Sequence, residues 1–227
     1  MMMRMRVHAL VPAFNEAATI AEVVKRVSPY VTRVWVSDDG STDQTAEIAT
    51  LAGAEIVVNR GERGKGRAIR AGLARVLEGD CTHVLLLDGD LQHLPEEAPL
   101  LIAEAQRTGA EVVLGERRFE RKAMPASRYH ANRIGSLALS RFLGLAIQDT
   151  QCGFRLFRTD ALRDLRLRAR GYDIETEMLV KLTRRGGRVA RVPITAVYAG
   201  QRSKLRPVRD TTKTCFLAVY YRYLERI

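Results

Sequence analysis

Hydrophobic residues in this chain gather in short runs, and amphipathic segments separate the runs. Five runs have the length and apolar character of buried strands, at residues 7–13, 33–37, 54–59, 82–87 and 111–115. The intervening segments are predicted to be helices, at residues 19–27, 44–52, 67–77 and 95–107. Strands that alternate with helices predict an α/β fold in which helices cover a parallel sheet.

The second half of the chain is less regular. We expect helices at residues 132–143, from about 177 to 185 and at 212–227, and a strand at 188–194. The polar-rich stretch at 149–155 is expected to be irregular. We therefore expect one domain over residues 1–210, with halves at 1–117 and 118–210, followed by an amphipathic helix at 211–227.

Acidic residues follow two of the predicted strands. Asp88 and Asp90 flank Gly89 directly after the fourth strand, and Asp38 and Asp39 follow the second. An open α/β sheet binds ligands at the carboxyl ends of its strands, and a hard divalent cation takes oxygen ligands that it shares with a substrate's phosphates. The Asp-Gly-Asp turn therefore predicts a metal–phosphate site, and a solvated turn is the alternative.

The positions of the glycines indicate which kinds of nucleotide-binding site are compatible with this chain. The glycine-rich loop at 61–66 precedes a helix and can approach a phosphate closely, although it lacks the P-loop spacing. A dinucleotide-binding Rossmann domain needs a G-x-G-x-x-G turn after its first strand. The turn here is PAFNE, without glycine, which counts against that assignment.

The charge of the chain is uneven. The formal net charge is +11, and residues 184–226 alone carry +9. This basic segment indicates an anionic partner, such as a nucleic acid, a lipid headgroup or a phosphorylated substrate, and a solvated basic face is the alternative. A module that only binds nucleic acid or a membrane would leave the ordered acidic motifs unexplained, so we expect no nucleic acid partner.

The cysteines and the apolar segments bear on location. Cys81, Cys152 and Cys215 are far apart and form no metal-binding spacing, which favours a reducing compartment. No stretch approaches the roughly 20 apolar residues that span a bilayer, and we see no signal peptide. We expect a cytoplasmic protein whose basic terminal helix lies on the cytoplasmic membrane face, and the alternative is a helix packed on the core or on a second copy.

Five stretches in this order resemble the family-2 glycosyltransferases. They are VPAFNE at 11–16, VSDDGSTD at 36–43, GKGRAIRAGL at 64–73, LLLDGDLQHLPE at 85–96 and TQCGFRLFR at 150–158. The chain looks most like the branch that uses polyprenyl phosphates, typified by dolichyl-phosphate mannose synthase. The resemblance implies the GT-A fold, which is a Rossmann-like, mostly parallel central sheet flanked by helices with an acceptor-side subdomain. It also implies inverting, metal-dependent transfer of a hexose from a GDP- or UDP-sugar to a polyprenyl phosphate.

On the donor side, the resemblance assigns roles to three groups of residues. The base and ribose of the nucleotide are expected against Pro12, Ala13, Asn15, Glu16, Asp38 and Asp39. Lys65, Asp88 and Gly89 are expected near the nucleotide. Mg²⁺ or Mn²⁺, and through it the diphosphate, is expected on Asp88, Asp90 and Gln92. Asp38 as a solvated acid beside a helix, and Gln92 as a surface turn residue, are the alternatives.

On the acceptor side, the resemblance places the lipid phosphate against Arg117, Arg133 and Ser136, and each is alternatively a surface residue. Asp90, Asp149 and Arg155 are the expected catalytic residues, with Arg155 as a clamp on phosphate. Arg202 and Lys204 are candidates for a lid over the donor phosphate. A sugar hydroxyl as acceptor would require a base, for which Asp149 and Glu175 are the candidates. The Gln-x-x-Arg-Trp signature of polysaccharide synthases is missing, which favours a phosphate or a small acceptor.

Overall fold

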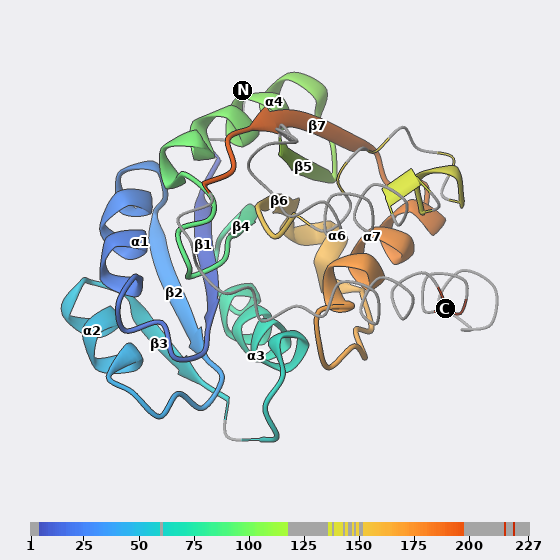
Figure 1. The fold of residues 1–227 in the computed structure, drawn as a ribbon. Helices are drawn as coiled ribbons and strands as arrows, with labels where there is room; N and C mark the ends of the chain where they lie inside the picture. Colours follow the sequence, from blue (N-terminus) through green and yellow to red (C-terminus); the bar gives the residue numbers. More distant parts are fainter. Residues whose placement is uncertain are drawn as a thin grey trace.

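A central sheet with helices on both faces forms the protein (Figure 1). The computed structural model describes residues 5–59, 61–117, 136–137, 139–142, 144, 147, 149, 152–197, 216 and 220. Within this part of the chain the strand order is β3-β2-β1-β4-β6-β5-β7. The strands are β1 Val7–Ala13, β2 Arg33–Asp38, β3 Glu55–Val58, β4 His83–Leu86, β5 Val112–Arg117, β6 Arg155–Arg158 and β7 Val189–Ile194.

Both faces of the sheet are buried, because side chains alternate between two cores along each strand. On β4, Leu85 belongs to one hydrophobic cluster, and Val84 and Leu86 belong to the other. The first cluster includes side chains from α1 Ile20–Val27, α2 Thr45–Leu51 and α4 Ala98–Thr108. The second includes side chains from α3 Lys65–Leu77, α6 Thr159–Arg163 and α7 Ile174–Arg184. The expected layered α/β architecture is thereby confirmed.

One strand was not expected from the sequence. Arg155–Arg158, partly inside the stretch predicted to be irregular, forms β6 and pairs antiparallel with both β4 and β5. The remaining pairings are parallel, so the sheet is mostly parallel. Because β6 runs against its neighbours, the residues that precede it lie at the carboxyl edge of the parallel strands. This reversal brings residues 152–154 to the edge where the acidic motifs end.

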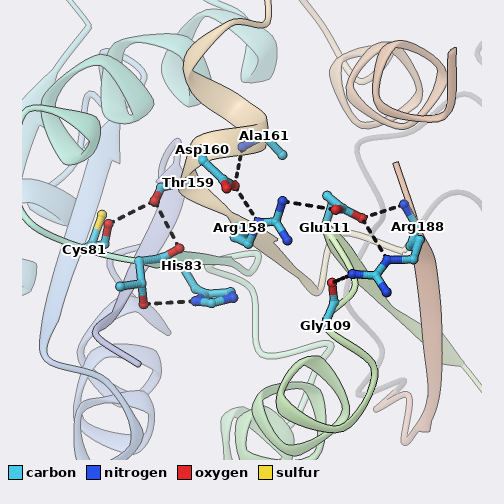
Figure 2. A network of polar contacts seen from close by, with 10 residues as sticks. Cys81, His83, Gly109, Glu111, Arg158, Thr159, Asp160, Ala161 and Arg188 are labelled. Carbon is cyan, nitrogen blue, oxygen red and sulfur yellow. Dashed lines mark hydrogen bonds and ion pairs between the residues drawn. The ribbon is translucent and has the colours of Figure 1, made fainter. Parts of the chain in front are cut away.

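A polar network anchors β6 at the opposite edge of the sheet (Figure 2). Arg158 forms an ion pair of 3.0 Å with Glu111 and one of 2.5 Å with Asp160. The Glu111 carboxylate also accepts a hydrogen bond of 2.6 Å from the backbone N–H of Arg188. The Thr159 hydroxyl donates to the carbonyl oxygens of residues 81 and 82. The network therefore ties together the ends of β4, β5, β6 and β7 that lie away from the acids.

Most element boundaries agree with the predictions to within about two residues. Strand β1 has the expected limits, whereas β5 continues through Arg117, two residues beyond its expected end. The helix expected from residue 95 begins as a 3-10 turn at Pro95–Glu97 before α4. Ser28–Tyr30 forms a second such turn after α1. The division into two halves stays a prediction.

Of the expected helix at 132–143, residues 136–137 and 139–142 are described and are helical, and the expected helix at 212–227 falls largely outside the described residues. In the second segment only Phe216 and Tyr220 are described. Phe216 is exposed and Tyr220 packs against the second core cluster. None of the helices in the described part of the chain has the length and hydropathy to cross a membrane.

Candidate functional site

The acidic motifs meet at one edge of the sheet. Ala13 at the end of β1 pairs with Asp38 at the end of β2, and Leu10 pairs with Leu86 on β4. All three strands run parallel, so the residues that follow them emerge side by side. The loop after β1, the acids after β2 and the Asp-Gly-Asp turn after β4 therefore form one site, as the sequence predicts.

The loop after β1 is fixed against the turn after β2. Asn15 has a positive φ of 54°, its backbone N–H donates to the Ser41 hydroxyl at 3.0 Å, and its side-chain oxygen accepts from the Thr42 N–H at 2.8 Å. The buried Asp38 carboxylate accepts from both the backbone N–H and the hydroxyl of Ser41. The Glu16 N–H donates to the hydroxyl of Thr45. The Asp43 carboxylate accepts from the N–H of the same threonine, at the start of α2.

Asp39 anchors the glycine-rich loop. Its carboxylate accepts from the Asn59 side chain and from the Gly64 N–H, at 2.7 Å each. A Cβ on Gly64 would lie 2.1 Å from the carbonyl oxygen of Arg170, so glycine is required by this close approach. Asp39 thus holds the loop that leads into α3. Pro12 and Ala13 are buried as the last residues of β1, and Asn15 is exposed.

Lys65, the first residue of α3, lies between two carboxylates. Its Nζ is 2.6 Å from Asp88 Oδ1 and 2.6 Å from Glu175 Oε1. Burial alone lowers the pKa of Lys65, but the two carboxylates outweigh it, so the pKa lies above its ordinary value. Burial raises the pKa of Asp88, but the Lys65 charge outweighs it and the pKa lies below its ordinary value. Lys65 and Asp88 are therefore both charged near neutral pH.

Asp90, the second acid of the turn, forms no ion pair with a lysine or arginine among the described residues. Burial, and then the charge of Asp88, raise its pKa to about 6. Its carboxylate accepts from the Gln92 N–H at 3.1 Å, and the Thr19 hydroxyl donates to the Gly89 carbonyl at 2.7 Å. No group of three or more His, Cys, Asp or Glu with metal-binding geometry occurs among the described residues.

The donor set at this turn fits a hard divalent cation. Asp88, Asp90 and Gln92 offer two carboxylates and an amide oxygen, which suits an ion that completes its shell with water and phosphate oxygens. Burial, and then the charge of Asp88, raise the pKa of Asp90, and a bound cation would stabilise its charged form. Which ion binds, and through which atoms, stays a prediction.

Two residues overlooked by the sequence reasoning pack against this turn. A Cβ on Gly153 would lie 2.4 Å from Asp88 Oδ2. His93 is buried, stacks on Phe154 with ring centroids 5.7 Å apart, and lies 3.9 Å from the Cys152 sulfur. Burial lowers the pKa of His93 to about 4, so the ring is neutral. In the sequence, the only sign of the role of His93 is that a histidine lies between Leu91 and Leu94. This sign does not show which element the histidine packs against.

Arg117 and Asp149 form a close ion pair. Arg117 Nε and Nη2 donate to the two Asp149 oxygens at 2.5 and 3.0 Å. The Asp149 side chain is fully buried, and the Arg117 side chain is 13% exposed. Ser136 is buried as well. Arg133, Arg202 and Lys204 lie outside the described residues, so their expected contacts with phosphate stay predictions.

Arg155 is buried and bonded to the backbone. Its side chain is among the largest that are fully buried, and it donates to the carbonyl oxygens of Cys152 at 2.7 Å and Glu175 at 2.8 Å. These two contacts tie the start of β6 to α7. The expected contact of Arg155 with phosphate stays a prediction.

Comparisons with known proteins agree with this geometry. The model of glycosyl transferase family 2 matches residues 9–166. The chain is 34% identical over 220 residues to glycosyltransferase AglJ of Haloferax volcanii, covering 94% of this chain and 70% of that protein. It is also 34% identical over 206 residues to undecaprenyl-phosphate mannosyltransferase of Micrococcus luteus, covering 85% of this chain and 84% of that protein.

A solved structure extends the likeness to the fold. Glucosyl-3-phosphoglycerate synthase from Mycobacterium tuberculosis, in complex with Mn²⁺, UDP-glucose and phosphoglyceric acid, superposes with a TM-score of 0.77 at 26% identity, covering 96% of this chain and 79% of that one. The fold and the sequence thus agree with the resemblance inferred from the motifs. The chain belongs to glycosyl transferase family 2, and the protein is a nucleotide-sugar-dependent glycosyltransferase.

Proposed function

We propose that this protein transfers a hexose from a nucleoside diphosphate sugar to a polyprenyl phosphate, with the help of Mg²⁺ or Mn²⁺. On the donor side, the loop at 12–16 and Asp38 receive the base and ribose, because carboxylate and backbone groups there suit hydroxyl donors. Asp88, Asp90 and Gln92 hold the cation. When bound, the cation would neutralise charge on the leaving diphosphate. The Mn²⁺ and UDP-glucose in the solved relative support this assignment.

The observation that carries the choice of acceptor is the ion pair of Arg117 with Asp149. A sugar hydroxyl would need a general base. The Asp149 side chain has no exposed surface and accepts two hydrogen bonds from the Arg117 guanidinium. Glu175, the other candidate, is 6% exposed and pairs with Lys65. A phosphate needs positioning by cations rather than deprotonation, which is the role that an oriented guanidinium serves well.

Asp149 in this proposal is a positioning residue. It fixes the Arg117 guanidinium from the buried side, so that the group needs no reorganisation when an anion arrives. The mannosyltransferase of Micrococcus luteus, whose name specifies undecaprenyl phosphate, supports an acceptor of this class.

A phosphorylated small molecule is the second candidate acceptor. The solved structures of glucosyl-3-phosphoglycerate synthase, which include complexes with phosphoglyceric acid, favour it. Both acceptors carry a phosphate, so Arg117 serves either. They differ in size and solubility, and a direct comparison separates them.

The test is a transfer assay with labelled UDP- and GDP-hexoses, Mn²⁺ or Mg²⁺, and two acceptor arms. One arm contains a polyprenyl phosphate in detergent and the other contains phosphoglyceric acid. We expect label in the organic phase of the first arm, and loss of transfer in Asp90→Ala. Transfer only to phosphoglyceric acid would replace the lipid acceptor by the small one. Full activity of Asp90→Ala would refute the metal site.

We also propose that the protein contacts an anionic membrane surface. Residues 184–226 carry a net charge of +9, and Phe216 within this segment is 71% exposed. Basic residues beside exposed aromatic ones favour the interface of an anionic bilayer. The test is sedimentation of the full chain with phosphatidylglycerol vesicles at low salt. The protein remaining in the supernatant would reject the idea.

A further inference from the structure

An ammonium group already occupies one side of the proposed cation site. Lys65 Nζ lies 2.6 Å from Asp88 Oδ1, and Asp88 is one of the two acids of the turn after β4. The same Nζ lies 2.6 Å from Glu175 Oε1, on α7 of the second half of the chain. The side chains are 15%, 27% and 6% exposed for Lys65, Asp88 and Glu175, so water screens this triad only weakly.

The surrounding structure keeps Lys65 in this position. Its neighbour Gly66 donates its N–H to the Arg170 carbonyl at 3.1 Å, and a Cβ there would lie 2.6 Å from the Ala169 carbonyl oxygen. The start of α3 is therefore packed directly onto the segment before α7. The Tyr172 ring, 5.5 Å from Lys65 Nζ, covers the ammonium from the same segment. Both α3 and the segment before α7 therefore fix the position of Lys65.

We propose that Lys65 sets the order of binding: its charge keeps Asp88 neutralised in the free enzyme, so that the divalent cation binds tightly only together with the donor diphosphate. The inference rests on the proposed metal site and adds a role for Lys65 and Glu175 that the proposed function does not require. A cation that shares Asp88 with an ammonium is repelled by it, because both charges lie in a partly buried place.

Glu175 has the opposite effect to Lys65 in this arrangement. Its negative charge offsets the ammonium and draws it away from Asp88. Removing the Lys65 charge should therefore strengthen binding of the metal to the free protein. Removing the Glu175 charge should weaken it, because the ammonium then interacts with Asp88 alone. The diphosphate brings negative charge of its own, so in its presence the repulsion is offset and Lys65 becomes a favourable partner of the anion.

The experiment measures Mn²⁺ binding to the full chain by the loss of the free-ion EPR signal, without any transfer reaction. The variants are Lys65→Met, which retains length without charge, and Glu175→Gln, which retains shape. The matched control is Lys25→Met, at an exposed position of α1. Each protein is titrated alone and again with saturating UDP or GDP.

We expect Lys65→Met to bind Mn²⁺ about tenfold more tightly than the wild type in the absence of nucleotide, where tenfold corresponds to about 1.4 kcal/mol. We expect Glu175→Gln to bind it several-fold more weakly and Lys25→Met to match the wild type. With saturating nucleotide, Lys65→Met should lose its advantage, because the charge of the diphosphate then offsets the repulsion that Lys65 exerts in the wild type.

Two results would overturn the inference. One is unchanged or weaker Mn²⁺ binding by free Lys65→Met, and the other is a shift of the same sign in both variants, which a general distortion of the site would produce. If Lys65→Met does not fold, as judged by its thermal transition, the sign of the Glu175→Gln shift decides. A wild type that binds no Mn²⁺ even with UDP or GDP would refute the metal site itself, which is a different failure.

Discussion

Replacing Gly153 with alanine is expected to disable the site while leaving the fold intact. The missing side chain of Gly153 makes room for the Asp88 carboxylate: an ideal Cβ would lie 2.4 Å from Oδ2, 2.9 Å from Cγ and 3.0 Å from Oδ1. Restoring an ordinary contact of 3.4 Å requires about 1 Å of relative movement. Asp88 cannot move freely, because Lys65 holds its other oxygen at 2.6 Å.

The size of the effect follows from this displacement. Overpacking of a well-packed place costs about 1–3 kcal/mol of the free energy of unfolding. A misplacement of a reacting or positioning group by about 1 Å costs on the order of 100-fold in rate. We therefore expect Gly153→Ala to lose about two orders of magnitude in kcat/KM for the donor. The loss of stability should be modest, since the rest of the sheet is unaffected.

The assay combines donor kinetics with chemical unfolding, and Gly79→Ala is the matched control. A Cβ on Gly79 would lie 3.5 Å or more from other atoms outside its neighbours, and this glycine is at the edge of the sheet away from the acids. The control should retain both activity and stability to within a small margin. Wild-type kinetics in Gly153→Ala would show that the Asp88 position is not under this constraint, and the reasoning from close packing would fail.

Three further predictions concern charge. Glu177→Gln should lower the free energy of unfolding by about 3 kcal/mol, because the buried Glu177 carboxylate holds Lys181 at 2.7 Å and a buried charge without its partner is costly. Urea unfolding measures this loss of stability, and a loss under 1 kcal/mol would contradict the prediction. Arg117→Lys should raise KM for the acceptor by about tenfold with little change in the donor KM, because lysine cannot make the bidentate contact with Asp149. Equal changes in the two KM values would contradict this prediction. Burial lowers the pKa of His83 from 6.5 to about 4, so the histidine takes up a proton on unfolding at pH values between these two, and the stability of the fold falls as the pH drops through this range. The loss of stability between pH 7 and 5, measured by urea unfolding, should be smaller in His83→Gln than in the wild type. An identical loss in the two proteins would contradict the prediction.

The layered fold was predictable because its signals are local. Alternation of apolar strands with amphipathic helices fixes the parallel α/β arrangement, and the limits of β1 follow from the run at 7–13. Strand β6 was missed for a physical reason. Its residues, Arg-Leu-Phe-Arg, give only two apolar positions, and the strand exists because β4 and β5 leave a gap between them that it fills in antiparallel fashion. That requirement is set by the sheet and cannot be read from four residues.

The candidate site was likewise predictable only in part. Asp38, Asp88 and Asp90 follow apolar runs, so the edge they share was predictable from the direction of parallel strands. The roles of Asp149 and Arg155 were not predictable, because a sequence gives residue types but does not show which partner a charged side chain contacts. Both belong to a segment that the sequence presents as polar and irregular, yet both side chains are buried in the structure.

Their burial bears on the chemistry that we propose. Asp149 meets Arg117, and Arg155 meets two backbone carbonyls, so we propose that both act by holding other groups in place. A charge buried against a partner serves a site by holding that partner still, and its removal should act on the binding of the ligand that the partner contacts. Asp149→Asn should therefore raise the acceptor KM, as we also expect for Arg117→Lys, without adding a pH-dependent limb to kcat. A general base would instead lose kcat at every acceptor concentration, and an acceptor KM unchanged in Asp149→Asn would return Asp149 to that role.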